Sequence, residues 1–182
     1  MSSSDFNIAW KQLPHPAKHP AFRYNGFHPG RVTYLPKGHV KQAGFQAFPV
    51  EVTWEQDCAI TMRDGIKLYG DVFRPTRGDR VPAIIPYSPY GKVDSGVLSY
   101  DLMGPYRIGI PYQRLSGYET FEGPNPAEWA ERGYAVVDID ARGCAHSEGN
   151  IVFWGQQEAE DIYDCITWVS QQPWCNGSVV LA

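Results

Sequence analysis

The sequence predicts an α/β fold with a mixed sheet, in which an antiparallel hairpin leads and parallel strands with crossover helices follow. Three observations support this prediction. Strand-like runs flank Asp64-Gly65, a dipeptide typical of hairpin turns. Two continuous apolar runs, at 83–86 and 134–138, are typical of strands buried on both faces. Helical patterns separate the later runs, and such alternation implies right-handed crossovers and a parallel sheet.

Composition limits the class of protein. The chain has 182 residues, enough for one ordinary domain, and 43% of them are hydrophobic, enough for a buried core. Its net charge is −4 and its basic residues are scattered, so we expect no nucleic-acid binding, which needs clustered Lys and Arg. The sequence has no run of about 18 apolar residues, so we expect no membrane span.

The four cysteines are not spaced as metal ligands. They are Cys58, Cys144, Cys165 and Cys175, without a C-x-x-C pair or the Cys/His spacing typical of zinc sites. No apolar segment typical of a secretory signal follows Met1. We therefore expect reduced, mostly buried thiols in a cytoplasmic protein without a metal.

Residues 1–49 and 50–182 differ in composition. The first segment is rich in Pro, Gly, His and Lys without a sustained period, which predicts an irregular arm over the rest of the protein. It contains His15, His19 and His28, but nearby prolines prevent a helix that would align the first two. Solvated or packed histidines are therefore favoured over a metal site. Regular structure is expected in the second segment.

The first half of 50–182 contains the predicted hairpin and one buried strand. Residues 50–54 alternate as a strand does, and Pro75 closes the hairpin that follows. The apolar run at 83–86 leads into a Pro/Gly loop. Residues 93–125 are rich in Gly, Pro and Tyr, and a loop of this length inside a domain is usually functional or a lid.

The second half shows two helical patterns. Residues 126–132 predict a short helix that Gly133 ends. After the strand at 134–138 and a polar loop, apolar residues recur at helical spacing over 156–171. A final buried strand is expected to begin at Ser178, after an Asn-Gly turn.

One short motif imitates a nucleophile site. The pentapeptide A-H-S-E-G at 145–149 is close to the G-x-S-x-G turn that carries a catalytic serine, and Cys144 beside it is a second candidate nucleophile. That turn places the serine directly between a strand and a helix. Here a polar loop separates Ser147 from the strand, and no helix follows directly. We therefore expect neither side chain to be the nucleophile.

The polar loop has a structural interpretation instead. Asp140 and Arg142 stand where a strand ends, and a short-range ion pair or carboxylate-to-backbone bonds would brace the loop. Gly143 and Gly149 suit positive φ or close approach of another segment. We expect a scaffold here rather than catalysis, although the loop lies at the carboxyl end of a parallel strand, where sites assemble.

Four blocks occur together in a distinctive order. They are R-D-G at 63–65, P-Y-x-K at 89–92, D-x-R-G-x-x-x-S-E-G at 140–149 and P-W-C-x-G at 173–177. With them, residues 50–182 resemble the amino-terminal part of the Xaa-Pro dipeptidyl-peptidase/cocaine-esterase-like family of α/β-hydrolases. Pattern alone leaves other doubly wound folds open. Two features depart from the family: Cys144 replaces a less reactive residue, and the 93–125 insertion is longer than in the bacterial esterases.

The resemblance implies a serine hydrolase that cleaves ester or amide bonds through an acyl-enzyme. Its Ser-Asp-His triad needs no metal or organic cofactor. The nucleophile would follow the strand that begins at Ser178, so the triad would lie beyond Ala182 and this chain would be an inactive fragment. Expected partners are small esters or amides, or short peptides such as Xaa-Pro substrates, and an oligomer stays open. The alternative is a non-catalytic binding or regulatory half-domain.

The resemblance also assigns one catalytic group to this chain. Tyr90 matches the tyrosine whose phenol donates a hydrogen bond to the oxyanion in cocaine-esterase-like members. A phenol with a pKa of about 10 is a donor at neutral pH. Without the family, a packed loop aromatic is the favoured interpretation, and Tyr87 is the nearby competitor for the role.

Overall fold

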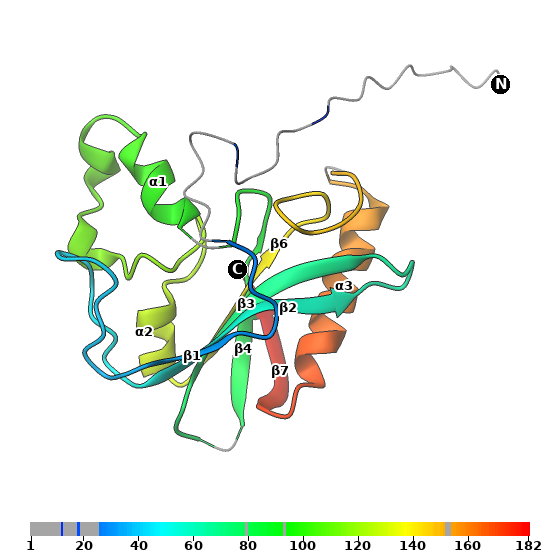
Figure 1. The fold of residues 1–182 in the computed structure, drawn as a ribbon, viewed down its shortest axis with the longest axis horizontal. Coiled ribbons are helices and arrows are strands. Elements are labelled where there is room, and N and C mark those ends of the chain that lie inside the picture. Colours follow the sequence, from blue (N-terminus) through cyan, green and yellow to red (C-terminus); the bar gives the residue numbers. More distant parts are fainter. Residues whose placement is uncertain (1–11, 13–17, 19–25, 79, 93, 152–153) are drawn as a thin grey trace.

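The computed structural model describes residues 12, 18, 26–78, 80–92, 94–151 and 154–182. In this part of the chain a seven-stranded sheet has the order β1-β2-β3-β6-β4-β7, with β5 paired to β6 (Figure 1). The strands are β1 (Val32–Leu35), β2 (Val52–Thr61), β3 (Lys67–Pro75), β4 (Val81–Ile85), β5 (Tyr87–Ser88), β6 (Ala135–Asp140) and β7 (Cys175–Leu181). The helices are α1 (Ser95–Asp101), α2 (Pro126–Glu131) and α3 (Gln156–Ser170), with short 3-10 turns η2 (Tyr106–Gly109) and η3 (Tyr112–Arg114).

β1, β2 and β3 form the antiparallel side of the sheet. The predicted hairpin turn is present: Gly65 N donates to Met62 O, and Gly65 has a φ of 89°, which glycine adopts without strain. The two strand-like runs before the turn form a single strand, β2, interrupted by a β-bulge at Asp57, whose φ is 49°. The backbone N–H of Asp57 leaves the ladder there and donates to Asp71 Oδ1 (3.0 Å).

The amino-terminal segment is partly regular. Residues 32–35 pair with β2 at the sheet edge, so the irregular arm expected over 1–49 contains a strand. This stretch can form a strand because it holds β-branched and aromatic residues and no proline. Phe48 is buried in the apolar layer that also contains side chains of β3 and α2. His15 and His19 lie outside the described residues.

The predicted loop over 93–125 also differs from the expectation. It contains α1, η2 and η3, and Leu115, Tyr118 and Thr120 in its second half are buried. α1 and the two 3-10 turns lie together to one side of the sheet (Figure 1). Short helical turns satisfy backbone groups that a long loop packed on the body would leave unpaired. Each turn is too short to give a periodic pattern in the sequence.

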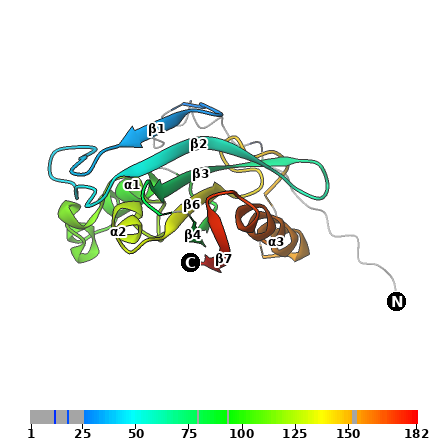
Figure 2. The ribbon, with the colours of Figure 1, turned by 90° about the horizontal axis from the view of Figure 1, so that it is seen from below.

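β6, β4 and β7 form the parallel side, and α2 and α3 cover opposite faces of the sheet (Figure 2). Val136 of β6 packs in the same layer as Ala130 of α2, whereas the next residue, Val137, packs in the layer of Val169 of α3. The alternation of side chains along the strand therefore builds two apolar layers. The predicted mixed sheet with crossover helices is confirmed. Among the described residues, the helices are all too short or too polar to cross a membrane.

The last strand begins earlier than expected from Ser178, because β7 starts at Cys175. Asn176-Gly177 lies within β7, where the register with β4 shifts and the glycine has a φ of 93°, so it forms an irregularity rather than a preceding turn. At the end of β7, Ala182 N donates to Ile85 O (3.1 Å) of β4. The chain thus leaves β7 at the same sheet edge as the loop that follows β4.

Candidate active site

The loop after β4 carries the predicted oxyanion donor. Tyr90 follows β5 at the carboxyl edge of the parallel strands and is 46% exposed. Its ring makes an edge contact with Phe121, with centroids 5.2 Å apart, and its hydroxyl forms no hydrogen bond within the described residues. Tyr87 is half-buried, burial raises its pKa, and its hydroxyl accepts a hydrogen bond from Arg142 N (3.2 Å). Tyr90 therefore presents a free donor, whereas Tyr87 serves the scaffold.

Buried hydroxyl groups fix the backbone around Tyr90. Ser88 Oγ accepts a hydrogen bond from Tyr90 N (3.1 Å). The Thr120 hydroxyl lies 2.8 Å from Ser88 Oγ and 2.8 Å from Gly91 O. Ser95 Oγ, at the start of α1, donates to Gly91 O (2.6 Å). The loop therefore has a defined geometry on both sides of the exposed tyrosine.

Lys92 ends this loop inside the protein, with a side chain only 8% exposed. Its Nζ lies 2.7 Å from Asp57 Oδ1 and 3.0 Å from Asp71 Oδ1, and its backbone N donates to Asp140 Oδ1 (2.7 Å). Burial lowers the pKa of Lys92, but the charges of Asp71, Asp140 and Asp57 outweigh this effect and raise the pKa above its ordinary value. Lys92 is therefore a buried cation.

Two carboxyl groups of β6 lie beside this cation. Asp138 and Asp140 share one face of the strand, and Asp138 pairs directly with Asp71 across the antiparallel ladder. Burial raises the pKa of Asp140 to about 7, and burial together with the charge of Asp71 raises the pKa of Asp138 well above its ordinary value. Neither carboxyl oxygen of Asp138 has a hydrogen-bond partner among the described residues. Burial without a hydrogen-bond partner among these residues therefore favours the protonated form of Asp138.

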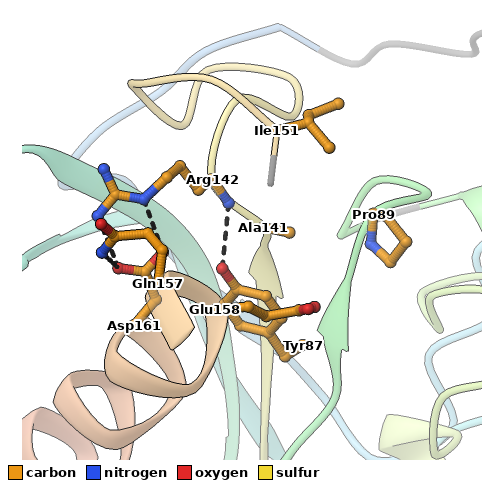
Figure 3. A pocket seen from close by; sticks show the side chains of 8 residues that line it. All are labelled: Tyr87, Pro89, Ala141, Arg142, Ile151, Gln157, Glu158 and Asp161. Carbon is orange, nitrogen blue, oxygen red and sulfur yellow. Dashed lines mark hydrogen bonds and ion pairs between the residues drawn. The ribbon is translucent and has the colours of Figure 1, made fainter. Parts of the chain in front are cut away.

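Arg142 ties the loop after β6 to α3 (Figure 3). Its Nε and Nη2 donate to the two carboxylate oxygens of Asp161, each at 2.7 Å, and its Nη1 lies 2.9 Å from Asp64 Oδ2 in the hairpin turn. Hydrogen bonds to Asp161 and Asp64 outweigh partial burial and raise the pKa of Arg142. The guanidinium thus joins three separate segments of the chain.

The residues expected to brace this loop act through different partners. Asp140 accepts a hydrogen bond from the backbone N–H of Lys92, which lies in the loop after β5, and Arg142 pairs with carboxylates outside its own loop. Gly143 has a φ of 74°, and a Cβ there would lie 2.6 Å from Ile151 N. Glycine is therefore needed at this position for both conformation and space.

Two of the cavities that described residues line lie at opposite edges of the sheet. The first has a volume of about 10 Å³, room for about one water molecule, so it cannot hold a substrate. Its lining is Tyr87, Pro89, Ala141, Arg142, Ile151, Gln157, Glu158 and Asp161 (Figure 3). The second, of about 330 Å³, lies where β3 and α2 end, and its charged lining residues are Lys37, Glu51, Arg77 and Glu131. Tyr90 lines neither cavity.

Ser147 and Cys144 are engaged in the scaffold. The Ser147 hydroxyl donates to Asp140 O (2.7 Å) and accepts from Tyr69 N (3.0 Å). Cys144 Sγ lies 3.4 Å from Pro89 O, and burial raises the pKa of this thiol to about 12. A nucleophile needs a free or base-activated atom, and neither side chain has one here.

Comparison with known proteins assigns the chain to a family. The sequence profile of the X-Pro dipeptidyl-peptidase (S15) family matches residues 64–182. The chain belongs to this family. The structure of a CocE/NonD family hydrolase from Staphylococcus aureus superposes on this S15 chain with a TM-score of 0.68 and 27% identity, covering 94% of this chain and 27% of that one. The S15 chain therefore has the amino-terminal half of an α/β-hydrolase fold.

Two curated relatives of the S15 chain bear esterase names. A protein of Mycobacterium bovis named as a candidate serine esterase is 33% identical over 129 residues, 67% of this chain and 19% of that protein. The cocaine esterase of Rhodococcus sp. is 32% identical over 120 residues, 66% of this chain and 17% of that enzyme. The S15 chain thus spans about a fifth of the length of these relatives.

Sequence reasoning missed the charged cluster around Lys92. The lysine stands in the P-Y-x-K block, but its partners Asp57 and Asp71 come from two other strands. One signal was present: Asp71 and Asp138 each interrupt an apolar strand run, in L-Y-G-D-V-F and A-V-V-D-I-D, where a carboxylate needs a partner. Within the described part of this S15 chain, His, Cys, Asp and Glu side chains form no group arranged to hold a metal ion.

Proposed function

We propose that this chain forms the amino-terminal part of a serine hydrolase that cleaves an ester or amide bond through an acyl-enzyme. The observation that carries the proposal is the free phenol of Tyr90 at the sheet edge where β7 ends. In this fold the nucleophilic serine stands on a sharp turn directly after a strand. A serine on a turn after β7 would therefore emerge beside the loop that holds Tyr90.

The proposed mechanism uses groups from two parts of a longer protein. A serine, activated by a histidine that an aspartate orients, attacks the carbonyl carbon, and its proton passes to the histidine. The tetrahedral oxyanion accepts hydrogen bonds from Tyr90 and from a backbone N–H after the nucleophile. We propose that the triad belongs to a part of the protein beyond Ala182. The coverage of about a fifth of the curated relatives and the engaged side chains of Ser147 and Cys144 support this proposal.

The proposed substrates are small esters or amides, or short peptides including Xaa-Pro peptides. Family membership supports a peptidase, and the names of the relatives support an esterase. Both classes pass through the same tetrahedral oxyanion, so the role of Tyr90 does not depend on the choice. Hydrolysis of a p-nitrophenyl ester and an Xaa-Pro anilide by the full-length protein distinguishes them.

The test of this function is Tyr90→Phe in the full-length protein. Loss of one oxyanion donor is expected to lower kcat by about 100-fold with little change in KM. Tyr163→Phe, which removes the hydroxyl of a tyrosine 63% exposed on α3, is the matched control and should turn over like the parent. Unchanged turnover in Tyr90→Phe would remove the tyrosine from the site, whereas a full-length parent that hydrolyses neither substrate would favour the alternative of a non-catalytic binding half-domain.

A further inference from the structure

Lys92 is fixed at both its backbone and its side chain. The backbone N–H is bound by Asp140 of β6, and the ammonium is bound by Asp57 in the bulge of β2 and by Asp71 of β3. Three strands therefore hold one residue, two positions after Tyr90. Further contacts of the loop come from the uncharged hydroxyl groups of Ser88, Ser95 and Thr120.

The two aspartates are themselves held in place. Asp71 Oδ1 accepts from Asp57 N (3.0 Å), and Asp71 Oδ2 accepts from Trp54 Nε1 (2.8 Å). Asp57 Oδ2 accepts from His28 N (2.6 Å). Both carboxylates are nearly fully buried. The ammonium thus meets a rigid acceptor pair, and a flexible lysine side chain acquires a single geometry.

Packing alone does not require this cation. A buried ion pair can often be replaced by apolar side chains of similar volume without loss of stability, because desolvation of the charges offsets their attraction. Charged, hydrogen-bonded groups fix the orientation of a side chain relative to its partners, which apolar packing does not. In this loop the connection ends two residues from Tyr90, whose phenol is exposed at the edge where β7 ends.

We propose that Lys92 is a positioning residue for Tyr90: its pairs with Asp57 and Asp71, together with the Asp140 bond to its backbone, hold the phenol where the oxyanion forms. This inference rests on the proposed function. Lys92 itself is too buried to touch the substrate and acts through Tyr90. Positioning matters because a displacement of about 1 Å in a catalytic group can lower turnover by about 100-fold.

The experiment is a double-mutant cycle in the full-length protein. Lys92→Met keeps the volume of the side chain and removes the ammonium, and it is expected to lower kcat by about 10- to 100-fold while KM changes less than about twofold. In the Tyr90→Phe background the same substitution should lower kcat by less than about threefold, because the group it positions is already absent. Amide hydrogen exchange should show faster exchange in residues 88–92 and unchanged exchange in α3.

Lys92→Met leaves two buried carboxylates without their cation and can prevent folding. The second variant is therefore Lys92→Met/Asp57→Asn, which removes one charge of each sign and places asparagine at a positive φ that it tolerates. It should fold and show the same fall in kcat. Val169→Ala, a cavity variant in the α3 core, is the control for general destabilisation and should keep the kcat of the parent per folded molecule.

The outcomes separate the two proposals. Absence of hydrolysis by the parent overturns the proposed function, and unchanged turnover in Tyr90→Phe overturns the role of Tyr90 and this inference with it. A loss in Tyr90→Phe with parental kcat in the folded Lys92 variants overturns the inference alone. An equal fall in kcat with and without the Tyr90 hydroxyl also overturns it, because Lys92 would then act independently of the phenol.

Discussion

Arg142 and Asp161 form a two-point ion pair between the loop after β6 and the first turns of α3, with both N–O distances at 2.7 Å. The side chains are 10% and 1% exposed. A planar guanidinium and a carboxylate bound in this way fix orientation as well as distance. The pair therefore sets the position of the loop at the carboxyl end of β6 relative to the helix that covers the sheet.

Breaking this pair should destabilise the chain strongly. Asp161→Asn removes the buried two-point partner of Arg142 and leaves the guanidinium with the more exposed Asp64 as its counter-charge, and we expect the free energy of unfolding to fall by about 3 kcal/mol. Urea unfolding followed by tryptophan fluorescence measures the change. Glu128→Gln removes the same type of partner from the exposed Arg132 pair on α2 and should change stability by about 0.5 kcal/mol or less. Equal effects of the two substitutions would contradict the role of Arg142.

The sequence predicted the elements of this region better than their contacts. The strand at 134–138 and the helix over 156–171 follow from apolar periodicity, which depends on neighbours along the chain. The partner of Arg142 was expected within its own loop, but it is a residue 19 positions away that one turn of α3 presents. Acidic residues at the start of a helix also have a local explanation in the helix dipole, which concealed the role of Asp161.

Ser147 is expected to be a structural residue. Its hydroxyl links Asp140 O to Tyr69 N, so Ser147→Ala should cost about 1–2 kcal/mol of stability by leaving Tyr69 N unsatisfied. The substitution should leave turnover of the full-length protein unchanged. A fluorophosphonate probe, which labels activated serines, should not label this 182-residue chain. Stoichiometric labelling at Ser147 would show that the serine is a nucleophile after all.

The thiol of Cys144 should be unreactive in the folded chain. It is buried against Pro89 O, and burial raises its pKa to about 12, so almost no thiolate exists at pH 8. Reaction with a disulfide reagent such as DTNB should be slow in buffer and fast in urea. Cys58 is the internal comparison for the rate of this reaction. It is half-buried, and burial raises its pKa to about 12 as well. Rapid labelling of Cys144 in the native protein would argue for an activated thiol.

The charged cluster shows where sequence reasoning stops. Asp71 and Asp138 were visible as polar interruptions of apolar runs, but their meeting with Lys92 depends on the pairing of β3 with β6 and on the bulge in β2. The residue with positive φ in this bulge is Asp57 rather than a glycine, so the sequence gives no local signal for the bulge. Tyr90 was predicted through a motif, whereas the groups that hold its loop come from positions far apart in the chain.

The buried carboxyl groups of β6 should make the chain less stable as pH rises. Burial raises the pKa of Asp140 to about 7 and that of Asp138 well above its ordinary value, so between about pH 4 and pH 7 the folded state binds more protons than the unfolded state. Stability contributed by these protonated groups is therefore present at low pH and is lost as pH rises through the folded pKa values. Asp138→Asn keeps a neutral polar group at all pH values and should flatten this fall by up to about 1.4 kcal/mol per pH unit. Urea unfolding of both proteins from pH 5 to pH 9 measures the slope of stability against pH. Glu128→Gln controls for the loss of one exposed carboxylate. Parallel pH curves for Asp138→Asn and its parent would show that Asp138 keeps the same protonation state in the folded and unfolded protein across this range.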